Sequence, residues 1–288
     1  MTGSASGVSG GGFSAPGGGA PVGTDGLADR DRSGMEAAPS PEAARAWVRR
    51  MLDGFGMIAA TPELKASASN PMEACFYAQD DRVSKKWRHY LEIYDRHLGR
   101  FRDKATRLLE MGVEHGGSLQ VWRRYLGKAA VIHGLDASPR TAQIDDPDLA
   151  VHVGNQVDTG LLSRIVEQMG GLDVVVDDCG HRCDHQITTF EHLFPLVADG
   201  GIYICEDTHS SYWRHYGGGL RAPGSFIEYA KGLMDAMHAR YLEAPDTLET
   251  DPRLDGVHSV AVYDSMVVIE KRRPQTPVRV GVGRRRLE

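Results

Sequence analysis

Residues 172–181, LDVVVDDCGH, place three consecutive valines before two acidic residues, a cysteine and a histidine. A short apolar run of this kind is typical of a strand that is buried on both faces, as strands of parallel sheets are. The polar side chains of Asp177, Asp178 and His181 then follow at the point where the strand ends. The stretch therefore predicts an α/β protein that carries its chemistry at the carboxyl ends of its strands.

Similar apolar runs occur on both sides of this strand and alternate with amphipathic helical patterns. The predicted strands are residues 107–112, 130–136, 150–155, 172–178 and 200–207, and the predicted helices are residues 116–127, 158–170, 183–197 and 225–244. Two β-rich runs at 257–264 and 265–272 are close enough to pair as a hairpin. We therefore expect a mostly parallel seven-stranded sheet with helices on both faces and an antiparallel C-terminal hairpin.

Composition divides the chain into four parts. Residues 1–40 are rich in Gly, Ser, Ala and Pro and are expected to form a disordered tail. Residues 41–103 form an N-terminal helical segment, with apolar residues at helical spacing in 41–55 and 84–99. Residues 104–273 carry the α/β domain, and residues 274–288 are expected to form a flexible basic tail.

The totals argue against several classes of protein. The 288 residues carry a formal charge of −6, and the strongly basic run is confined to the C-terminal end, so nucleic acid is not an expected partner. We find no secretory signal and no stretch long enough to span a membrane, which predicts a cytoplasmic protein with no membrane partner. Four cysteines in a chain of this length indicate reduced thiols and not a disulfide framework.

The turn after the first predicted strand, LLEMGVEHGGSL at 108–119, is glycine-rich but departs from the G-x-G-x-x-G dinucleotide pattern. Asp136 ends the next strand, where an acid can accept hydrogen bonds from both ribose hydroxyls. Glu110 would repel a pyrophosphate but suits a cofactor with an amino group and a sulfonium, which predicts S-adenosylmethionine. The alternative is that Glu110 and Asp136 only stabilise a turn and a helix. The other predicted cofactor-binding residues lie around the strand ends: Gly112, Gly116, Ser118, Asn155, Gln156 and Asp177.

Three further acids are predicted to converge in one crevice. Asp178 ends one strand, and Glu206 and Asp207 end its expected neighbour, so their mutual repulsion requires a cation. Oxygen ligands favour a hard ion such as Mg²⁺.

A zinc site is the alternative for the same stretch, because it contains Cys179, His181, Cys183 and His185. These four residues alternate within seven positions, whereas structural zinc sites use two spaced pairs of ligands. We therefore prefer magnesium.

His181 follows Asp178 by three residues, close enough to reach the same pocket without binding the metal. Its imidazole titrates near neutral pH, which predicts a general base. The alternative is that His181 starts the following helix by bonding to the backbone. In the loop after the fifth strand, Tyr212 and Trp213 offer stacking faces for a sugar ring, or else they pack on the core.

Several of these motifs, in this order, resemble the metal-dependent sugar O-methyltransferases of antibiotic biosynthesis, with the cephalosporin hydroxylase family as a cousin. The likeness covers residues 85–273 and rests on LLEMGVEHGGSLQVWRRYL, HGLDAS, VHVGNQVD, VVVDDCGH, HLFPLVADGGIYICEDTHSSYW and VYDSMVVIEK. It implies a class I S-adenosylmethionine-dependent methyltransferase fold, magnesium at the positions of Asp178, Glu206 and Asp207, and His181 as the base. Where the family usually has Asp-Gly-Ser-His this chain reads DCGH, so Cys179 is expected to reshape the turn.

The predicted function is magnesium- and S-adenosylmethionine-dependent methyl transfer to a sugar hydroxyl. The resemblance implies a deoxysugar such as rhamnose, on a glycosylated natural product or a nucleotide-sugar precursor, and a homo-oligomeric enzyme. In this hypothesis two vicinal hydroxyls bind the metal and His181 removes the proton of one of them. Two alternatives stay open: an oxygenase or accessory protein of the cephalosporin hydroxylase kind, and a non-catalytic cofactor-binding module.

Overall fold

The computed structural model describes residues 40, 42, 56–243 and 252–284. The chain divides into two compact units, Met1–Ala59 and Ala60–Glu288. The predicted tail at 1–40 and the predicted helix at 41–55 lie almost entirely outside the described residues. The fold below is that of the second unit.

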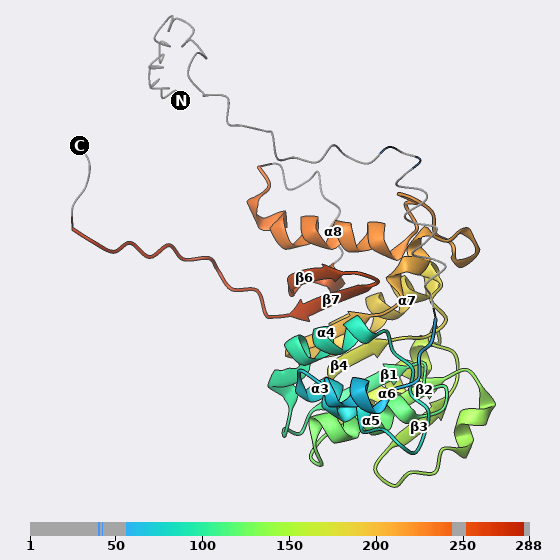
Figure 1. Cartoon of the computed structure of the whole chain (residues 1–288). Helices are drawn as coiled ribbons and strands as arrows, with labels where there is room; N and C mark the ends of the chain where they lie inside the picture. Colours follow the sequence, from blue (N-terminus) through green and yellow to red (C-terminus); the bar gives the residue numbers. More distant parts are fainter. Residues whose placement is uncertain (1–39, 41, 43–55, 244–251, 285–288) are drawn as a thin grey trace, which may run out of the picture. The chain divides into compact units, whose positions relative to one another are not determined.

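A seven-stranded sheet forms the centre of this unit (Figure 1), in the order β3-β2-β1-β4-β5-β7-β6. Its strands are β1 (Arg107–Met111), β2 (Val131–Asp136), β3 (Ala150–Val153), β4 (Leu172–Asp177), β5 (Val197–Cys205), β6 (Val257–Tyr263) and β7 (Met266–Lys271). The first five strands are parallel, and β7 pairs antiparallel with both β5 and β6. The predicted mixed sheet and its C-terminal hairpin are confirmed.

Helices cover both faces of the sheet, as predicted. One face packs against α3 (Pro71–Tyr77), α4 (Arg88–Leu98) and α5 (Gly117–Leu126), and the other packs against α6 (Thr159–Met169), α7 (Cys183–Leu193) and α8 (Phe226–His238). A short helix, α2 (Pro62–Ala66), precedes α3. The helices α2 to α4 belong to the same compact unit as the sheet, and the proposed division at residues 103 and 104 stays a prediction.

The strand β4 has apolar residues at consecutive positions because both of its faces are buried. Val174 and Val176 contribute to the core under α3, α4 and α5, whereas Val175 contributes to the core on the opposite face. All three side chains are fully buried. A central parallel strand buries both faces, so its sequence does not alternate between apolar and polar residues.

The strand order reverses at β1, which has β2 on one side and β4 on the other. In open parallel sheets, ligands bind at the carboxyl ends of the strands near such a point. The register pairs Met111 with Asp177 and Asp177 with Cys205, so the ends of β1, β4 and β5 lie level. The residues that follow these three strands therefore share one edge of the sheet.

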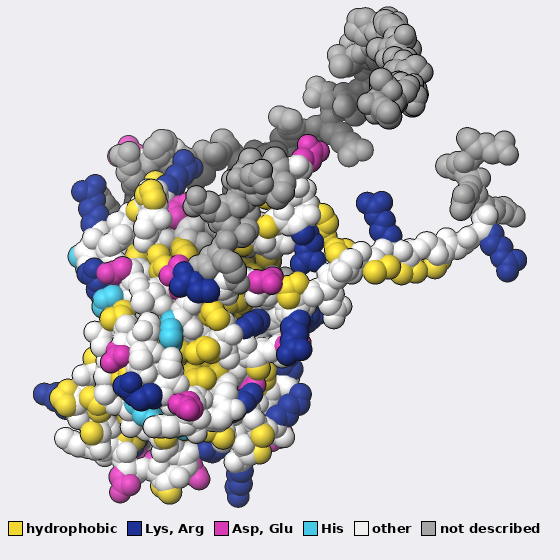
Figure 2. All heavy atoms as spheres, turned by 180° about the vertical axis from the view of Figure 1, so that it is seen from behind, with side chains coloured by type: hydrophobic (Ala, Val, Ile, Leu, Met, Phe, Trp, Pro, Cys, Tyr) yellow, Lys and Arg dark blue, Asp and Glu magenta, His cyan; other side chains and the backbone are white. Residues whose placement is uncertain are grey.

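The surface of the described residues carries charges of both signs. Figure 2 shows Lys and Arg side chains distributed over one face among acidic and uncharged groups. Within the described ranges, no helix has the length and apolar character that a membrane crossing needs. Residues 274–284 form no helix or strand and are exposed.

Candidate active site

The ends of β4 and β5 bring two of the predicted metal ligands together with the predicted base. One ligand atom from each of Asp178, His181 and Asp207 lies within 4.8 Å of the others. Asp178 follows β4 directly and its backbone N–H donates to the Met111 carbonyl at 3.0 Å, which ties it to the end of β1. The cluster is partly exposed, so a substrate can reach it.

His181 and Asp207 both have left-handed backbone conformations, with φ values of 49° and 51°. Such conformations cost non-glycine residues about 1–2 kcal/mol each and are concentrated at functional sites. The His181 Nε2 atom lies 3.6 Å from Oδ2 of Asp207, and its Nδ1 atom is buried without a hydrogen-bond partner. The nitrogen that faces the acids is therefore Nε2.

The Asp207 carboxylate is oriented by the segment that leads into α4. Its Oδ1 atom accepts hydrogen bonds from Trp87 Nε1 at 3.0 Å and from the Tyr90 hydroxyl at 2.8 Å. Burial and the Asp207 charge raise the pKa of Tyr90 above its usual value, so this hydroxyl stays a donor. Both donors bind the same oxygen, which leaves Oδ2 facing His181.

Glu206, the third predicted ligand, points to a different set of partners. Its carboxylate is buried, accepts a hydrogen bond from the Tyr94 hydroxyl, and has both oxygens 3.0 Å from Lys86 Nζ. The same ammonium lies 2.7 Å from Oδ2 of Asp178. Burial and the charge of Asp178 raise the pKa of Glu206, and the charge of Lys86 opposes this shift. Glu206 thus adjoins Asp178 through Lys86 but is not part of the cluster with His181.

The donor atoms of the cluster fit a divalent cation. The two carboxylates favour a hard ion such as Mg²⁺, and the His181 imidazole lies beside them within 4.8 Å. In the described part of the chain, this metal-competent cluster contains neither Cys179 nor Cys183, and all four cysteines are free. The cluster thus offers no pair of sulfur ligands for zinc, and the reduced state of the thiols stays a prediction.

The turn after β1 lies directly beside this cluster. Glu110 is fully buried, its Oε2 atom accepts a hydrogen bond from Ser118 Oγ at 2.5 Å, and its Oε1 atom has no hydrogen-bond partner. Burial raises the pKa of Glu110, and the charge of Lys86 opposes this shift. Gly112 has φ +90°, and a Cβ atom there would lie 2.1 Å from the carbonyl oxygen of Asp178. Only glycine therefore allows the two strand ends to approach this closely.

Asp136 organises the same turn from the end of β2. Its Oδ2 atom accepts hydrogen bonds from the backbone N–H groups of Val113 and Glu114, both at 2.9 Å, and its Oδ1 atom accepts from Ser138 at 2.7 Å. Asp136 is partly exposed, and its carboxylate can accept further hydrogen bonds. Gly116, with φ +85°, is the residue before α5.

The residues that follow β3 separate into an exposed and a buried position. Asn155 is exposed, and its Oδ1 atom accepts from the Val157 N–H at 3.1 Å. Gln156 is buried and donates to Asp177 Oδ1 at 3.3 Å, while the Tyr203 hydroxyl donates to Asp177 Oδ2 at 2.7 Å. Burial raises the pKa of Asp177 to about 7. Gln156 and Asp177 therefore form a polar cluster behind the strand ends, and their assignment to cofactor binding stays a prediction.

The loop after β5 presents aromatic side chains next to the acids. Tyr212 is 51% exposed and Trp213 is 38% exposed. The Trp213 ring lies 4.7 Å from the His209 ring, and the His209 ring lies 6.3 Å from Trp87. A row of rings thus runs from the exposed loop to the segment that holds Asp207, which suits a flat or sugar ligand.

Sequence reasoning missed four residues of this site: Lys86, Trp87, Tyr90 and Tyr94. The apolar spacing of residues 84–99 predicts only a helix. A signal was present, because Tyr90 and Tyr94 are four residues apart and lie on one helical face, with a polar atom at the end of each ring. Buried Tyr hydroxyls and Trp N–H groups require partners, and here those partners are the predicted acids.

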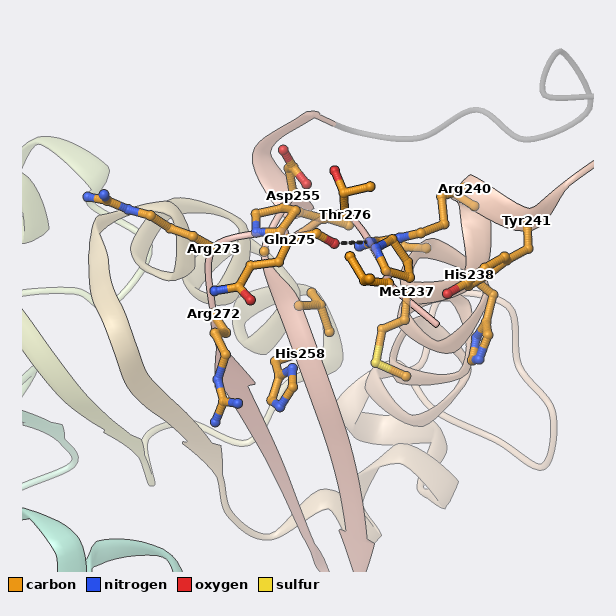
Figure 3. Close-up of a pocket in the computed structure, with 18 residues that line it drawn as sticks. Met237, His238, Arg240, Tyr241, Asp255, His258, Arg272, Arg273, Gln275 and Thr276 are labelled. Atoms are coloured by element: carbon orange, nitrogen blue, oxygen red, sulfur yellow. Dashed lines mark hydrogen bonds between the residues drawn. The ribbon is translucent and has the colours of Figure 1, made fainter. Parts of the chain in front are cut away.

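A cavity of about 900 Å³ lies apart from the strand ends, between the end of α8, the start of β6 and residues 272–278 (Figure 3). Arg240 donates to the Gln275 carbonyl across it at 2.8 Å. Because β7 is antiparallel to both β5 and β6, the strand β6 runs in the same direction as β5. The start of β6 therefore lies at the opposite end of the strands from the carboxyl ends of β4 and β5. None of the residues that line this cavity belongs to the site above.

Comparison with known proteins relates this arrangement to sugar methylation. The chain is 36% identical to the 8-demethyl-8-(2-methoxy-alpha-L-rhamnosyl)-tetracenomycin-C 3'-O-methyltransferase of Streptomyces olivaceus, over 65% of this chain and 50% of that protein. It is 33% identical to the mycinamicin VI 2''-O-methyltransferase of Micromonospora griseorubida, over 62% of this chain and 47% of that protein. The chain spans about half the length of the curated relatives it matches. No family model matches the chain.

A solved structure extends the likeness to three dimensions. The MycE methyltransferase from the mycinamycin biosynthetic pathway, in complex with Mg and SAH, has a TM-score of 0.62 and 28% identity, covering 81% of this chain and 60% of that chain. The predicted class I methyltransferase fold is confirmed, and so is the resemblance to sugar O-methyltransferases of antibiotic pathways.

Proposed function

We propose that this chain is a magnesium- and S-adenosylmethionine-dependent O-methyltransferase that acts on a sugar hydroxyl. The observation that carries the proposal is the cluster of Asp178, His181 and Asp207, within 4.8 Å of one another beside the glycine turn of the sheet's switch point. The relatives reported above are all methyltransferases, which favours methyl transfer over the oxygenase alternative.

In this proposal Asp178 and Asp207 would hold the ion, and Glu206, which now pairs with Lys86, would be the third carboxylate ligand. When bound, Mg²⁺ would supply Lewis-acid polarisation of the acceptor hydroxyl. His181 accepts the hydroxyl proton at Nε2, the ring nitrogen that faces the acids. The carboxylate of Asp207, 3.6 Å away, stabilises the imidazolium that results.

The cofactor is proposed to lie over the turn between β1 and α5. Asp136 would accept hydrogen bonds from the ribose hydroxyls. Its carboxylate is already held in place by hydrogen bonds from the backbone of this turn. Glu110 and Ser118 would line the methionine end, next to Asp178. Gly112 and Gly116 have no side chains that would block the cofactor at this turn. The other proposed cofactor-binding residues are Asn155, Gln156 and Asp177.

The acceptor is proposed to be a deoxysugar such as rhamnose, on a glycosylated natural product or a nucleotide-sugar precursor. The names of the relatives support this class of acceptor. The exposed rings of Tyr212 and Trp213 support a sugar-stacking role beside the acids. A homo-oligomer, a cytoplasmic location and the lack of nucleic-acid and membrane partners are part of the same proposal.

Calorimetry and a turnover assay test the proposal. Binding of S-adenosylmethionine is measured with and without Mg²⁺, and formation of S-adenosylhomocysteine is followed on a panel of rhamnosides and other deoxysugar glycosides. We expect turnover that is lost with EDTA and restored by Mg²⁺, and that is lost in Asp178→Asn. Cofactor binding without metal-dependent turnover on any vicinal diol would instead support the non-catalytic module.

A further inference from the structure

A buried lysine lies among three of the acids described above. The Nζ atom of Lys86 is 2.7 Å from Asp178, 3.0 Å from Glu206 and 3.4 Å from Glu110. These acids come from the ends of β4, β5 and β1, and the lysine side chain is only 5% exposed. The lysine thus lies between the proposed cofactor acid and two proposed metal ligands.

The charge state of this lysine follows from its neighbours. Three carboxylates lie within 3.4 Å of its nitrogen, and such a set of acids favours the charged ammonium form. The ammonium has three N–H donors, and its hydrogen bonds go to Oδ2 of Asp178 and to both oxygens of Glu206, while Oε1 of Glu110 is an ion-pair neighbour at 3.4 Å. No donor is left over for the carboxylate of a cofactor, and a protonated amine cannot act as a base.

We propose that Lys86 is an internal counter-ion, shared by Glu110, Asp178 and Glu206, that holds these acids together in the metal-free protein and limits how tightly a divalent cation binds. This inference rests on the proposed function, since it concerns the same metal site. The buried carboxylates of Glu110 and Glu206 and the partly exposed carboxylate of Asp178 would repel one another without a cation, so the lysine stabilises their close arrangement. A dication and Lys86 then compete for the oxygens of Asp178 and Glu206.

The competition explains why Glu206 lies outside the metal-competent cluster. Its two oxygens are both bound by Lys86, and one of them also accepts from Tyr94. Asp178 shares only Oδ2 with the lysine, which leaves Oδ1 for a metal. Removing the lysine charge should therefore release Glu206 for the metal and lower the cost of placing a dication beside it.

The variant Lys86→Met tests this inference, because methionine retains an unbranched apolar stem and loses the charge. Without Mg²⁺, we expect its melting temperature to fall clearly below that of the wild type. With saturating Mg²⁺, we expect the difference to shrink. Its magnesium dissociation constant should be tighter by on the order of tenfold or more, since a positive charge a few ångströms from the dication is gone. Both readouts are independent of turnover.

Lys85→Met is the matched control. Lys85 is the adjacent residue, is 43% exposed, and pairs with Glu114, which is 55% exposed. Exposed pairs contribute little to stability, so this variant should match the wild type in melting temperature and in magnesium affinity.

A second variant covers the case in which Lys86→Met does not fold. The double variant Lys86→Met with Glu110→Gln carries one buried charge fewer, so it should melt higher than Lys86→Met alone. A double variant that also fails to fold in the presence of Mg²⁺ would overturn the inference, because the ion should replace the missing charge.

The outcomes separate this inference from the proposed function. If the wild type shows no magnesium binding, the proposed function fails and the inference fails with it. If the wild type binds magnesium but Lys86→Met has unchanged stability and affinity, or weaker affinity, only the inference fails.

Discussion

Replacing Gly112 with alanine tests whether the close approach of β1 and β4 holds the metal site in place. The new Cβ atom would lie 2.1 Å from the Asp178 carbonyl oxygen and 2.7 Å from its carbonyl carbon. Ordinary contacts between such atoms are roughly 3.5 Å, so the two backbones must separate by roughly 1.4 Å. Asp178 would move with its backbone, away from His181 and Asp207. A displacement of about 1 Å in a catalytic group can cost roughly 100-fold in rate.

Gly170→Ala provides a control with the same backbone strain and no clash. Gly170 ends α6 with φ 73°, and an added Cβ atom there meets no atom within 4 Å. The left-handed conformation alone costs alanine about 1–2 kcal/mol. For a domain of this size that corresponds to a decrease in melting temperature of about 2–8 °C. Gly170→Ala should show this decrease with unchanged turnover.

The assay combines thermal melting with formation of S-adenosylhomocysteine at saturating substrate and Mg²⁺. We expect Gly112→Ala to melt below Gly170→Ala and to lose about 100-fold in turnover. If the two variants matched in melting temperature and both kept wild-type turnover, the strand ends would tolerate separation, and the geometric argument for the site would be refuted.

Three further predictions address other parts of the molecule. His181→Asn should lower turnover by roughly 100-fold or more with unchanged S-adenosylmethionine binding by calorimetry, and a smaller loss would rule out its role as the base. Trp87→Phe removes one donor to Asp207 and should weaken magnesium binding by roughly 10–100-fold in a metal titration, whereas an unchanged affinity would exclude an orienting role. Burial and the neighbouring His152 lower the pKa of His133 to about 4, so the folded state keeps this ring neutral while the unfolded chain binds a proton below pH 6.5. Stability should therefore fall as the pH decreases from about 6.5 to 4, and melting scans of His133→Asn should show a shallower decrease over that window than the wild type.

The sheet could be predicted from the sequence because its central strands have an unambiguous pattern. Val174 to Val176 are buried on both faces, so the run is apolar at every position, and the acids begin where burial ends. The order of the strands places Asp178 beside Glu206 without further information, since adjacent parallel strands end together. The sequence therefore predicts the part of the site that lies at the ends of β4 and β5.

The contacts that residues 86–94 make with the acids could not be predicted in the same way. Lys86 is 92 residues from Asp178 along the chain, and Tyr94 is 112 residues from Glu206. An amphipathic helix pattern gives the buried face of a helix but not the element that it meets. The local pattern also did not separate Gln156 and Asp177, which lie inside the protein, from Asp178, which faces the site. That distinction depends on Tyr203, whose hydroxyl holds Asp177 from β5.

The energetics of Asp207 show how the two sides depend on each other. Its left-handed backbone costs about 1–2 kcal/mol. A hydrogen bond from a neutral donor to the charged carboxylate contributes about 1.5–3 kcal/mol, so the Trp87 donor alone is comparable to the strain. The single proton of the Tyr90 hydroxyl is shared between Asp207 and Ser265, which lie at equal distances of 2.8 Å. Because Trp87 and Tyr90 both bind Oδ1, they also fix the direction of Oδ2 toward His181 before any ligand arrives. The strand end supplies the carboxylate and its strained turn, and Trp87 just before α4 and Tyr90 within α4 supply the hydrogen bonds that stabilise this strained geometry.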